Sequence, residues 1–160
     1  MTIMSEMKKI LNPWRGHPRY NCFGCAPNNP IGLHLEFWED GDDIVTHWQP
    51  GQNYQGWIDT LHGGILSTLI DETCGWVVTS KKKTNGFTVE LNVRYRKAVS
   101  THEKQLTVRA HITDHRRNLL YMHATVTNSS GELCAEGDVI YYLMSVEKAK
   151  EIGFESFGDE

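Results

Sequence analysis

Long apolar runs and a surplus of positive charge are both missing from this sequence. No stretch of about 18 or more consecutive apolar residues occurs, so no membrane-spanning helix is expected. Residues 1–9 lack the apolar core of a signal peptide. The formal net charge of −4 provides no basic stripe of the kind that binds nucleic acid. These absences predict a cytoplasmic protein that binds neither membranes nor nucleic acids.

Cysteine is also scarce. The chain has 160 residues and only four cysteines, which is too few for a disulfide framework, so reduced thiols are expected. There is no internal repeat and no linker between domains. With 39% hydrophobic and 22% charged residues, the composition is that of one globular domain with a complete core.

Proline and glycine are concentrated at the start of the chain. These breakers of regular structure predict an irregular N-terminal arm over residues 1–30. The main domain is expected over residues 31–144, followed by a C-terminal tail over 145–160. Within that tail, residues 145–152 can form a short helix.

A hairpin is predicted directly after the arm. Residues 32–38 alternate apolar and polar side chains, as a half-buried strand does, and residues 44–48 form the returning strand after a turn at 41–43. A loop over residues 49–61 follows. It ends at Asp59 and Thr60, and either side chain could cap the next helix.

One long amphipathic helix is predicted next. Apolar residues recur at spacings of three and four from Ile65 to Val78, which indicates a helix packed on a broad surface. The helix is expected to end near Ser80, where lysines 81–83 suit the negative end of its dipole.

Four further strands follow the helix. Each alternates apolar and polar residues, and turns at 115–117 and 128–131 join the later ones. We expect them over residues 87–96, 104–113, 118–127 and 133–144. Together with the hairpin, they predict an α+β fold in which an antiparallel sheet of about six strands wraps around one long central helix.

The start of the long helix has an unusual composition. His62 is followed by Gly63 and Gly64, although a glycine within a helix costs about 1 kcal/mol relative to alanine. Glycines are useful there if a ligand must approach the backbone, because a helix N-terminus attracts negative charge. Asp71 and Glu72 lie further along the same helix. An oxyanion site beside a carboxylate is one interpretation; tight packing of the glycines and a structural role for the carboxylate are the alternatives.

Several segments resemble those of hotdog-fold thioesterases, in particular the phenylacetate-degradation-type (PaaI-like) branch of the 4-hydroxybenzoyl-CoA thioesterase superfamily. The segments are Cys22–Cys25, Asn29–Leu33, Leu61–Gly64, Asp71 and Gly86–Tyr95. The resemblance covers residues 20–143. It implies hydrolysis of acyl-CoA thioesters by a homodimer or a dimer of dimers (a homotetramer), with active sites between subunits and with no metal or other cofactor.

The resemblance also implies roles for individual residues. Asp71 would act as general base or as nucleophile. The Gly63 N–H would polarise the thioester carbonyl, with Gly64 beside it, and one such donor contributes about 3–4 kcal/mol in the transition state. His62 would orient the loop or the thioester, and Thr88 would position the attacking water.

Helix geometry adds a constraint to these roles. Gly63 and Asp71 lie about 12–13 Å apart along one helix at about 1.5 Å per residue, too far to act on one carbonyl. A site between two subunits is therefore expected. Glu72 competes with Asp71 for the role of carboxylate, because some hotdog branches use Glu. It points about 100° away on the helix, and we favour Asp71.

Substrate-binding residues are less clearly marked. Many relatives have an Asn in the loop before the His-Gly-Gly segment, and this chain has Asn53 and Gln55 there. Arg94, Arg96 and Lys97 are the cationic candidates for the CoA phosphates. A solvated charged face is the alternative explanation for each of them.

Cys22 and Cys25 form a C-x-x-C motif, which supplies half of a tetrahedral zinc site. His17 and His34 flank it, but their spacing matches no closed zinc-finger pattern. A redox motif would follow a strand at a helix start, whereas this one lies in the irregular arm. Structural, metal-binding and redox roles all remain open at this point.

The sequence therefore predicts an acyl-CoA thioesterase that acts on a small-to-medium aliphatic or aryl acyl group. A non-catalytic acyl-CoA-binding hotdog module is the main rival. A hotdog hydratase is disfavoured by the spacing between His62 and Asp71. Neither the acyl group nor the choice between dimer and tetramer follows from the sequence.

Overall fold

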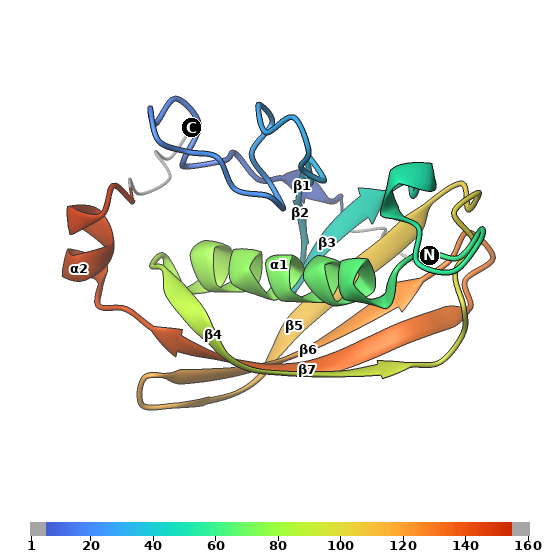
Figure 1. Ribbon diagram of the computed structural model, residues 1–160. Helices are drawn as coiled ribbons and strands as arrows, with labels where there is room; N and C mark the ends of the chain where they lie inside the picture. Colours follow the sequence, from blue (N-terminus) through green and yellow to red (C-terminus); the bar gives the residue numbers. More distant parts are fainter. Residues whose placement is uncertain (1–5, 155–160) are drawn as a thin grey trace.

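One long helix lies across a seven-stranded antiparallel sheet in the computed structural model, which describes residues 6–154 (Figure 1). The helices are the 3₁₀ turn η1 (Gln52–Tyr54), α1 (Gly63–Lys82) and α2 (Val146–Glu151). The strands are β1 (Lys8–Lys9), β2 (Trp38–Asp40), β3 (Asp43–Trp48), β4 (Gly86–Tyr95), β5 (Leu106–Arg116), β6 (Leu119–Thr127) and β7 (Leu133–Leu143). Their order in the sheet is β1-β2-β3-β5-β6-β7-β4. This arrangement confirms the predicted α+β hotdog fold.

The central strands follow the predicted alternation. In β6 every second side chain is buried, and its outward neighbours are half-buried. The inward residues of β6 meet the apolar side chains of α1, among them Leu69, Ile70 and Val77, which are fully buried. Burying a side chain of this size contributes about 1.5–3 kcal/mol. The buried side chains of α1 therefore form one continuous core with the sheet.

The arm covers the side of α1 that faces away from the sheet (Figure 1). Trp76 of α1 stacks on Phe37, with ring centroids 4.8 Å apart. Because the sheet covers one side and the arm another, the second half of α1 is buried around most of its circumference. This explains why the apolar stripe in the sequence is so broad.

The predicted helix start needs correction. Neither Asp59 nor Thr60 caps α1, because Asp59 has a positive φ of 59° and Thr60 forms a β-bridge with Ser100. The cap is His62, whose Nδ1 accepts a hydrogen bond from the Gly64 N–H at 2.9 Å. At the other end, α1 continues to Lys82, and Lys83 is left-handed with φ 52°.

The strand predicted over 32–38 is also largely wrong. Its apolar residues Leu33, Leu35 and Phe37 are buried as expected, but only Trp38–Asp40 pairs as a strand. The amides of Leu33 and Leu35 bond instead to carbonyls of the arm, and His34 between them has φ 54°. The alternation therefore reports burial correctly, while the hydrogen bonds go to the arm and not to a sheet.

Smaller differences concern the ends of the domain. Two-residue β1 lies within the predicted irregular arm and raises the strand count to seven; it pairs with β2 and is too short for a periodic signal. Strand β5 continues to Arg116, so the turn begins later than predicted. The tail helix forms as α2, with Ser145 as its cap. Residues 1–5 of the arm and 155–160 of the tail lie outside the described residues. None of the helices within residues 6–154 has the length and apolarity to cross a membrane.

The packing of α1 predicts the effect of a truncation. Leu69 is fully buried against the sheet, so Leu69→Ala should lower the free energy of unfolding by about 2–5 kcal/mol. Leu11 in the arm is 49% exposed, and Leu11→Ala is the matched control, with an expected loss below about 1 kcal/mol. Urea unfolding followed by circular dichroism measures both. Equal losses in the two variants would contradict the placement of α1 in the core.

Candidate functional site

The first turn of α1 leaves one backbone donor available. His62 Nδ1 accepts the N–H of Gly64, but no described residue accepts a hydrogen bond from the N–H of Gly63. The opposite side of Gly63 is held in place, because its carbonyl accepts a hydrogen bond from Tyr95 Oη at 3.0 Å. The Gly63 N–H therefore lies at the positive end of the helix dipole and has no hydrogen-bond partner among residues 6–154.

The two glycines have different steric surroundings. A Cβ on Gly64 would lie 3.0 Å from His62 Nδ1, so the capping histidine leaves little room for a side chain. A Cβ on Gly63 would meet the ring of Tyr95 at 3.4 Å, an ordinary contact. Tight packing therefore explains Gly64. It does not explain Gly63, whose free N–H is the feature that distinguishes it.

Two hollows flank this helix start. One of about 430 Å³ is lined by Gln55, Gly56, Trp57, Leu61, His62 and Gly63. The other, of about 360 Å³, is lined by Asn53, Tyr54, Gln55, His62, Gly64, Ile65 and Thr68. The structure thus places the predicted Asn53 and Gln55 beside His62 and the glycines. Gln55 Oε1 already accepts the Asp59 N–H at 2.9 Å, so the oxygen of Gln55 orders its own loop.

Asp71 lies two turns further along α1 and faces β4 and β7. Its Oδ1 accepts a hydrogen bond from Thr88 Oγ1 at 2.6 Å and another from Tyr141 Oη at 3.3 Å. Tyr141 Oη also lies 3.1 Å from the Asp71 carbonyl. No described residue donates to Oδ2. The carboxylate is thus oriented through one oxygen and available for chemistry through the other.

A β-bulge in β4 makes this contact possible. The pairing of β4 with β7 shifts between Thr88 and Glu90, which leaves Val89 as an extra residue. Simple alternation would place Val89, Val93 and Tyr95 on one face and Thr88 on the other. Instead, Thr88 and Tyr95 both hydrogen-bond to α1, one on each side of the bulge. The regular alternation predicted from the sequence over this strand is therefore wrong at Val89, where the bulge interrupts it.

Glu72 points in a different direction from Asp71. Its carboxylate lies against the arm, where a Cβ on Gly24 would come within 2.4 Å of Glu72 Cδ. Cys22 Sγ lies 3.4 Å from Glu72 Oε1. Burial, reinforced by the charge of the Cys22 sulfur, raises the pKa of Glu72 to about 7. The two adjacent carboxylates therefore belong to separate environments, and Asp71 is the one beside Thr88.

The predicted cationic residues do not meet this site. Arg94 pairs with a carboxylate of β7 at 3.4 Å, and Arg96 with another at 3.2 Å. Lys97 forms an ion pair with Glu132. All three are about half exposed, and no described hydrogen bond or ion pair joins them to Asp71 or Gly63. Exposed ion pairs contribute about 0–1 kcal/mol, so the partners are easily exchanged.

Two tyrosines that the sequence left without a role complete the arrangement. Tyr95 holds the first turn of α1 through Gly63 and through Ser67, whose Oγ is 2.6 Å from Tyr95 Oη. Tyr141 holds Asp71. Burial of Tyr141, together with the nearby Asp71 charge, raises the pKa of its hydroxyl. Tyr95 is the last residue of the segment Gly86–Tyr95, and the resemblance of that segment to hotdog-fold thioesterases could have pointed to a role for it. No feature of the sequence pointed to a role for Tyr141.

Comparison with known proteins agrees with this architecture. A zebra fish thioesterase superfamily member 2 has a TM-score of 0.65 and 23% identity, over 74% of this chain and 90% of that one. A hypothetical thioesterase from Streptococcus pneumoniae, solved with coenzyme A, has a TM-score of 0.62 and 23% identity, over 65% and 82% of the chains. The protein smu.793 from Streptococcus mutans, bound to acetyl CoA, has a TM-score of 0.61 and 13% identity, over 91% and 94%. At these identities the similarity establishes the fold.

Sequence comparison finds one family model that is similar to the central region. No curated protein matches the chain. The family model described as Thioesterase superfamily matches residues 59–135, a region that contains His62, Gly63, Asp71 and Thr88. Residues 59–135 of this chain are therefore similar to the Thioesterase superfamily.

Proposed function

We propose that this protein is an acyl-CoA thioesterase of the PaaI-like branch that hydrolyses small-to-medium aliphatic or aryl acyl-CoA. The observation that carries the proposal is the pair of unused groups on α1, the Gly63 N–H and Asp71 Oδ2. Two structural neighbours support the substrate class, since one was solved with coenzyme A and another with acetyl CoA. A cytoplasmic location belongs to the proposal and agrees with four free cysteines.

The proposal includes a homodimer in which each site uses both subunits. Gly63 and Asp71 are separated by eight residues of one helix, about 12 Å, so a single chain cannot direct both at one carbonyl. Strand β4 ends the sheet and has one unpaired edge. It also exposes apolar side chains, with Phe87 56% and Val89 54% accessible. Pairing of this edge with a second copy would cover these residues and complete the site.

Each group then has a defined task. Asp71 Oδ2 takes a proton from a water molecule, while Thr88 and Tyr141 hold Oδ1 in place. The water oxygen forms a bond to the thioester carbon, and negative charge develops on the carbonyl oxygen. The partner's Gly63 N–H and the positive end of that helix stabilise this charge. The C–S bond then breaks, and CoA leaves as a thiolate that takes up a proton. Direct attack by Asp71 Oδ2 is the alternative first step, with water cleaving the resulting anhydride.

The role of Asp71 predicts a large loss of activity on substitution. Asp71→Asn keeps the size of the side chain and removes the base, so kcat should fall by about a hundredfold or more. The assay is thiol release from short, medium, long and aryl acyl-CoAs. Asp42→Asn, in the exposed β2–β3 turn, is the matched control and should keep the wild-type rate. A loss of only a few fold in Asp71→Asn would refute this role. Tight acyl-CoA binding by the wild type without turnover would instead identify a non-catalytic binding module.

Thr88 allows a finer test, because its hydroxyl, not its shape, is proposed to matter. Thr88→Val keeps the shape and removes the hydrogen bond to Asp71 Oδ1, so kcat should fall by roughly tenfold to a hundredfold. Thr88→Ser keeps the hydroxyl and should restore most of the rate. If the valine and serine variants were equally active, Thr88 would be only a strand-forming residue.

Mixing two inactive variants tests whether the site is shared between subunits. Gly63→Pro removes the free N–H and suits the first position of a helix, where proline is well accepted. The other variant is Asp71→Asn. If the site uses both subunits, half of the dimers in an equal mixture are mixed, and one of their two sites is intact. About a quarter of the wild-type activity should then return.

The same mixture separates the two possible arrangements. If Gly63 and Asp71 of one chain formed a site together, the mixture would stay inactive. The variants are unfolded and refolded together so that subunits exchange, and sedimentation confirms that dimers have formed. Gly63→Ala, which retains the N–H, should be more active than Gly63→Pro.

A further inference from the structure

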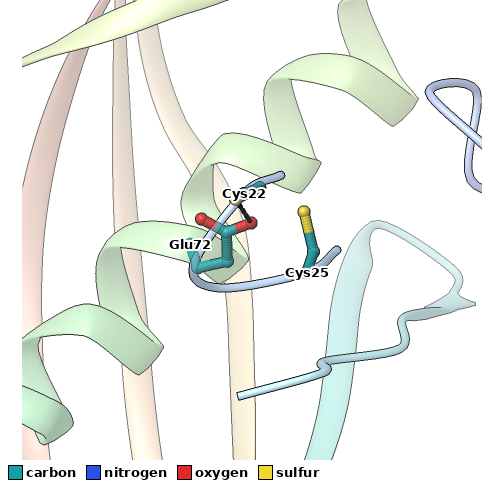
Figure 2. A group of neighbouring side chains, drawn as sticks. All are labelled: Cys22, Cys25 and Glu72. Carbon is teal, nitrogen blue, oxygen red and sulfur yellow. Dashed lines mark hydrogen bonds between the residues drawn. The ribbon is translucent and has the colours of Figure 1, made fainter. Parts of the chain in front are cut away.

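The C-x-x-C motif of the arm lies directly over the middle of α1. One ligand-capable atom from each of Cys22, Cys25 and Glu72 lies within 4.8 Å of the other two (Figure 2). The two sulfurs come from one tight turn of the arm, whereas the carboxylate comes from the helix beneath it, fifty residues away. The fold therefore brings together three donors that the sequence keeps far apart.

Backbone hydrogen bonds hold the sulfur-bearing turn in this position. The Ala26 N–H closes the turn on the Cys22 carbonyl at 3.0 Å, and Leu35 bonds to the Gly24 carbonyl at 2.9 Å. Gly24 has no room for a side chain, since a Cβ would lie 2.4 Å from Glu72 Cδ. The glycine between the two cysteines is thus required for the close approach to the carboxylate.

Glu72 carries a second and independent signal. Its carboxylate lies beneath the arm, yet no described lysine, arginine or histidine forms an ion pair with it. Its hydrogen-bonding neighbour is the thiol of Cys22. Covered carboxylates are normally paired with a cation or bound to a metal ion. The cluster has three potentially anionic groups and no described cation, so a divalent ion would satisfy all three.

We propose that Cys22 Sγ, Cys25 Sγ and one carboxylate oxygen of Glu72 bind a zinc ion, with a water molecule as the fourth ligand. Two thiolates exclude calcium and magnesium, which take oxygen ligands, and favour zinc. Tetrahedral zinc with bonds of about 2.0–2.3 Å separates its ligands by about 3.3–3.8 Å. The 3.4 Å between Cys22 Sγ and Glu72 Oε1 has this value.

Neighbouring side chains support this ligand set. Tyr20 Oη lies 2.7 Å from Cys25 Sγ and accepts a hydrogen bond from Asn12 Nδ2 at 2.9 Å, so its hydroxyl is placed to donate to a thiolate at Cys25. Such a donor orients a metal-bound thiolate. The flanking histidines are engaged elsewhere: His34 Nε2 bonds to the Asn29 carbonyl, and His17 Nδ1 accepts the Arg19 N–H. The third ligand is Glu72 and not a histidine.

Zinc at this position would join the arm to one turn of α1. Glu72 directly follows Asp71, so the ion would fix the helix turn that carries the proposed base. This role is structural, because the ion lies on the arm side of α1 and Asp71 faces the sheet. The inference is independent of the proposed thioesterase activity, and a failure of either leaves the other standing.

The test is metal binding by the full-length, reduced protein. One zinc per chain is expected by elemental analysis. Cobalt titrated into the zinc-free protein should give thiolate-to-metal absorption in the near ultraviolet and tetrahedral bands in the visible range. Cys22→Ser and Cys25→Ser should each hold less than about a tenth of the wild-type zinc. Cys134→Ala, which removes a buried cysteine far along the chain in β7, is the matched control and should keep the full content.

Glu72→Gln is the decisive variant, because it keeps both thiols and the size of the side chain. It should bind zinc at least about tenfold more weakly than the wild type and change the visible cobalt spectrum. Circular dichroism establishes that each variant is folded. A wild-type protein that binds neither zinc nor cobalt under reducing conditions would overturn the proposal. Unchanged zinc affinity in Glu72→Gln would do the same.

Thermal unfolding gives a further readout that does not depend on activity. Removal of zinc by a chelator should lower the Tm of the wild type by several degrees, because the ion binds only the folded arm. The chelator should have a much smaller effect on Glu72→Gln. A Cys22–Cys25 disulfide that is reduced without any gain in zinc binding would identify a redox pair and contradict the metal site.

Discussion

Burial of α1 between the sheet and the arm is the interaction on which the rest of this structure depends. The sheet supplies an apolar floor of alternating side chains, and the arm supplies a cover that the sequence of the arm alone does not suggest. Because α1 is packed on two sides, it cannot rotate about its axis, and the direction of each of its side chains relative to the sheet is fixed. The Gly63 N–H, Asp71 and Glu72 all belong to α1, so this packing arrangement positions all three.

The helix turns by about 100° per residue, and the molecule uses this rotation to separate neighbouring functions. Asp71 meets a threonine and a tyrosine on the sheet side. Glu72, one residue later, meets two sulfurs on the arm side. Two adjacent carboxylates thereby have different partners, although both side chains carry the same chemical group. At the N-terminus of α1, a third functional group, the Gly63 N–H, points along the helix axis and away from both carboxylates.

Much of this arrangement could be predicted from the sequence, because periodicity is a local property. The spacing of apolar residues located α1 and the four long strands, and the His-Gly-Gly segment marked the helix start. What could not be predicted depends on contacts between distant segments. His62 replaces Asp59 and Thr60 as the cap, a choice decided by how the preceding loop folds. The residues from Leu33 to Phe37 are buried like a strand but bond to the arm. The contact between Glu72 and the C-x-x-C motif could be recognised only from the tertiary structure.

The bulge at Val89 makes the length of β4 functionally significant. A regular strand tolerates exchange of almost any outward side chain, yet here the number of residues, and not only their identity, determines which side chains face the helix. Thr88 and Tyr95 are seven residues apart, so strict alternation at this length would turn one of them away from α1, and the extra residue at the bulge brings both to the same face. A relative that shares the site can therefore either keep the bulge with an odd number of steps between the threonine and the tyrosine, or lose the bulge together with one residue. A change in strand length without a matching change at the bulge would separate the two hydroxyls onto opposite faces of the sheet.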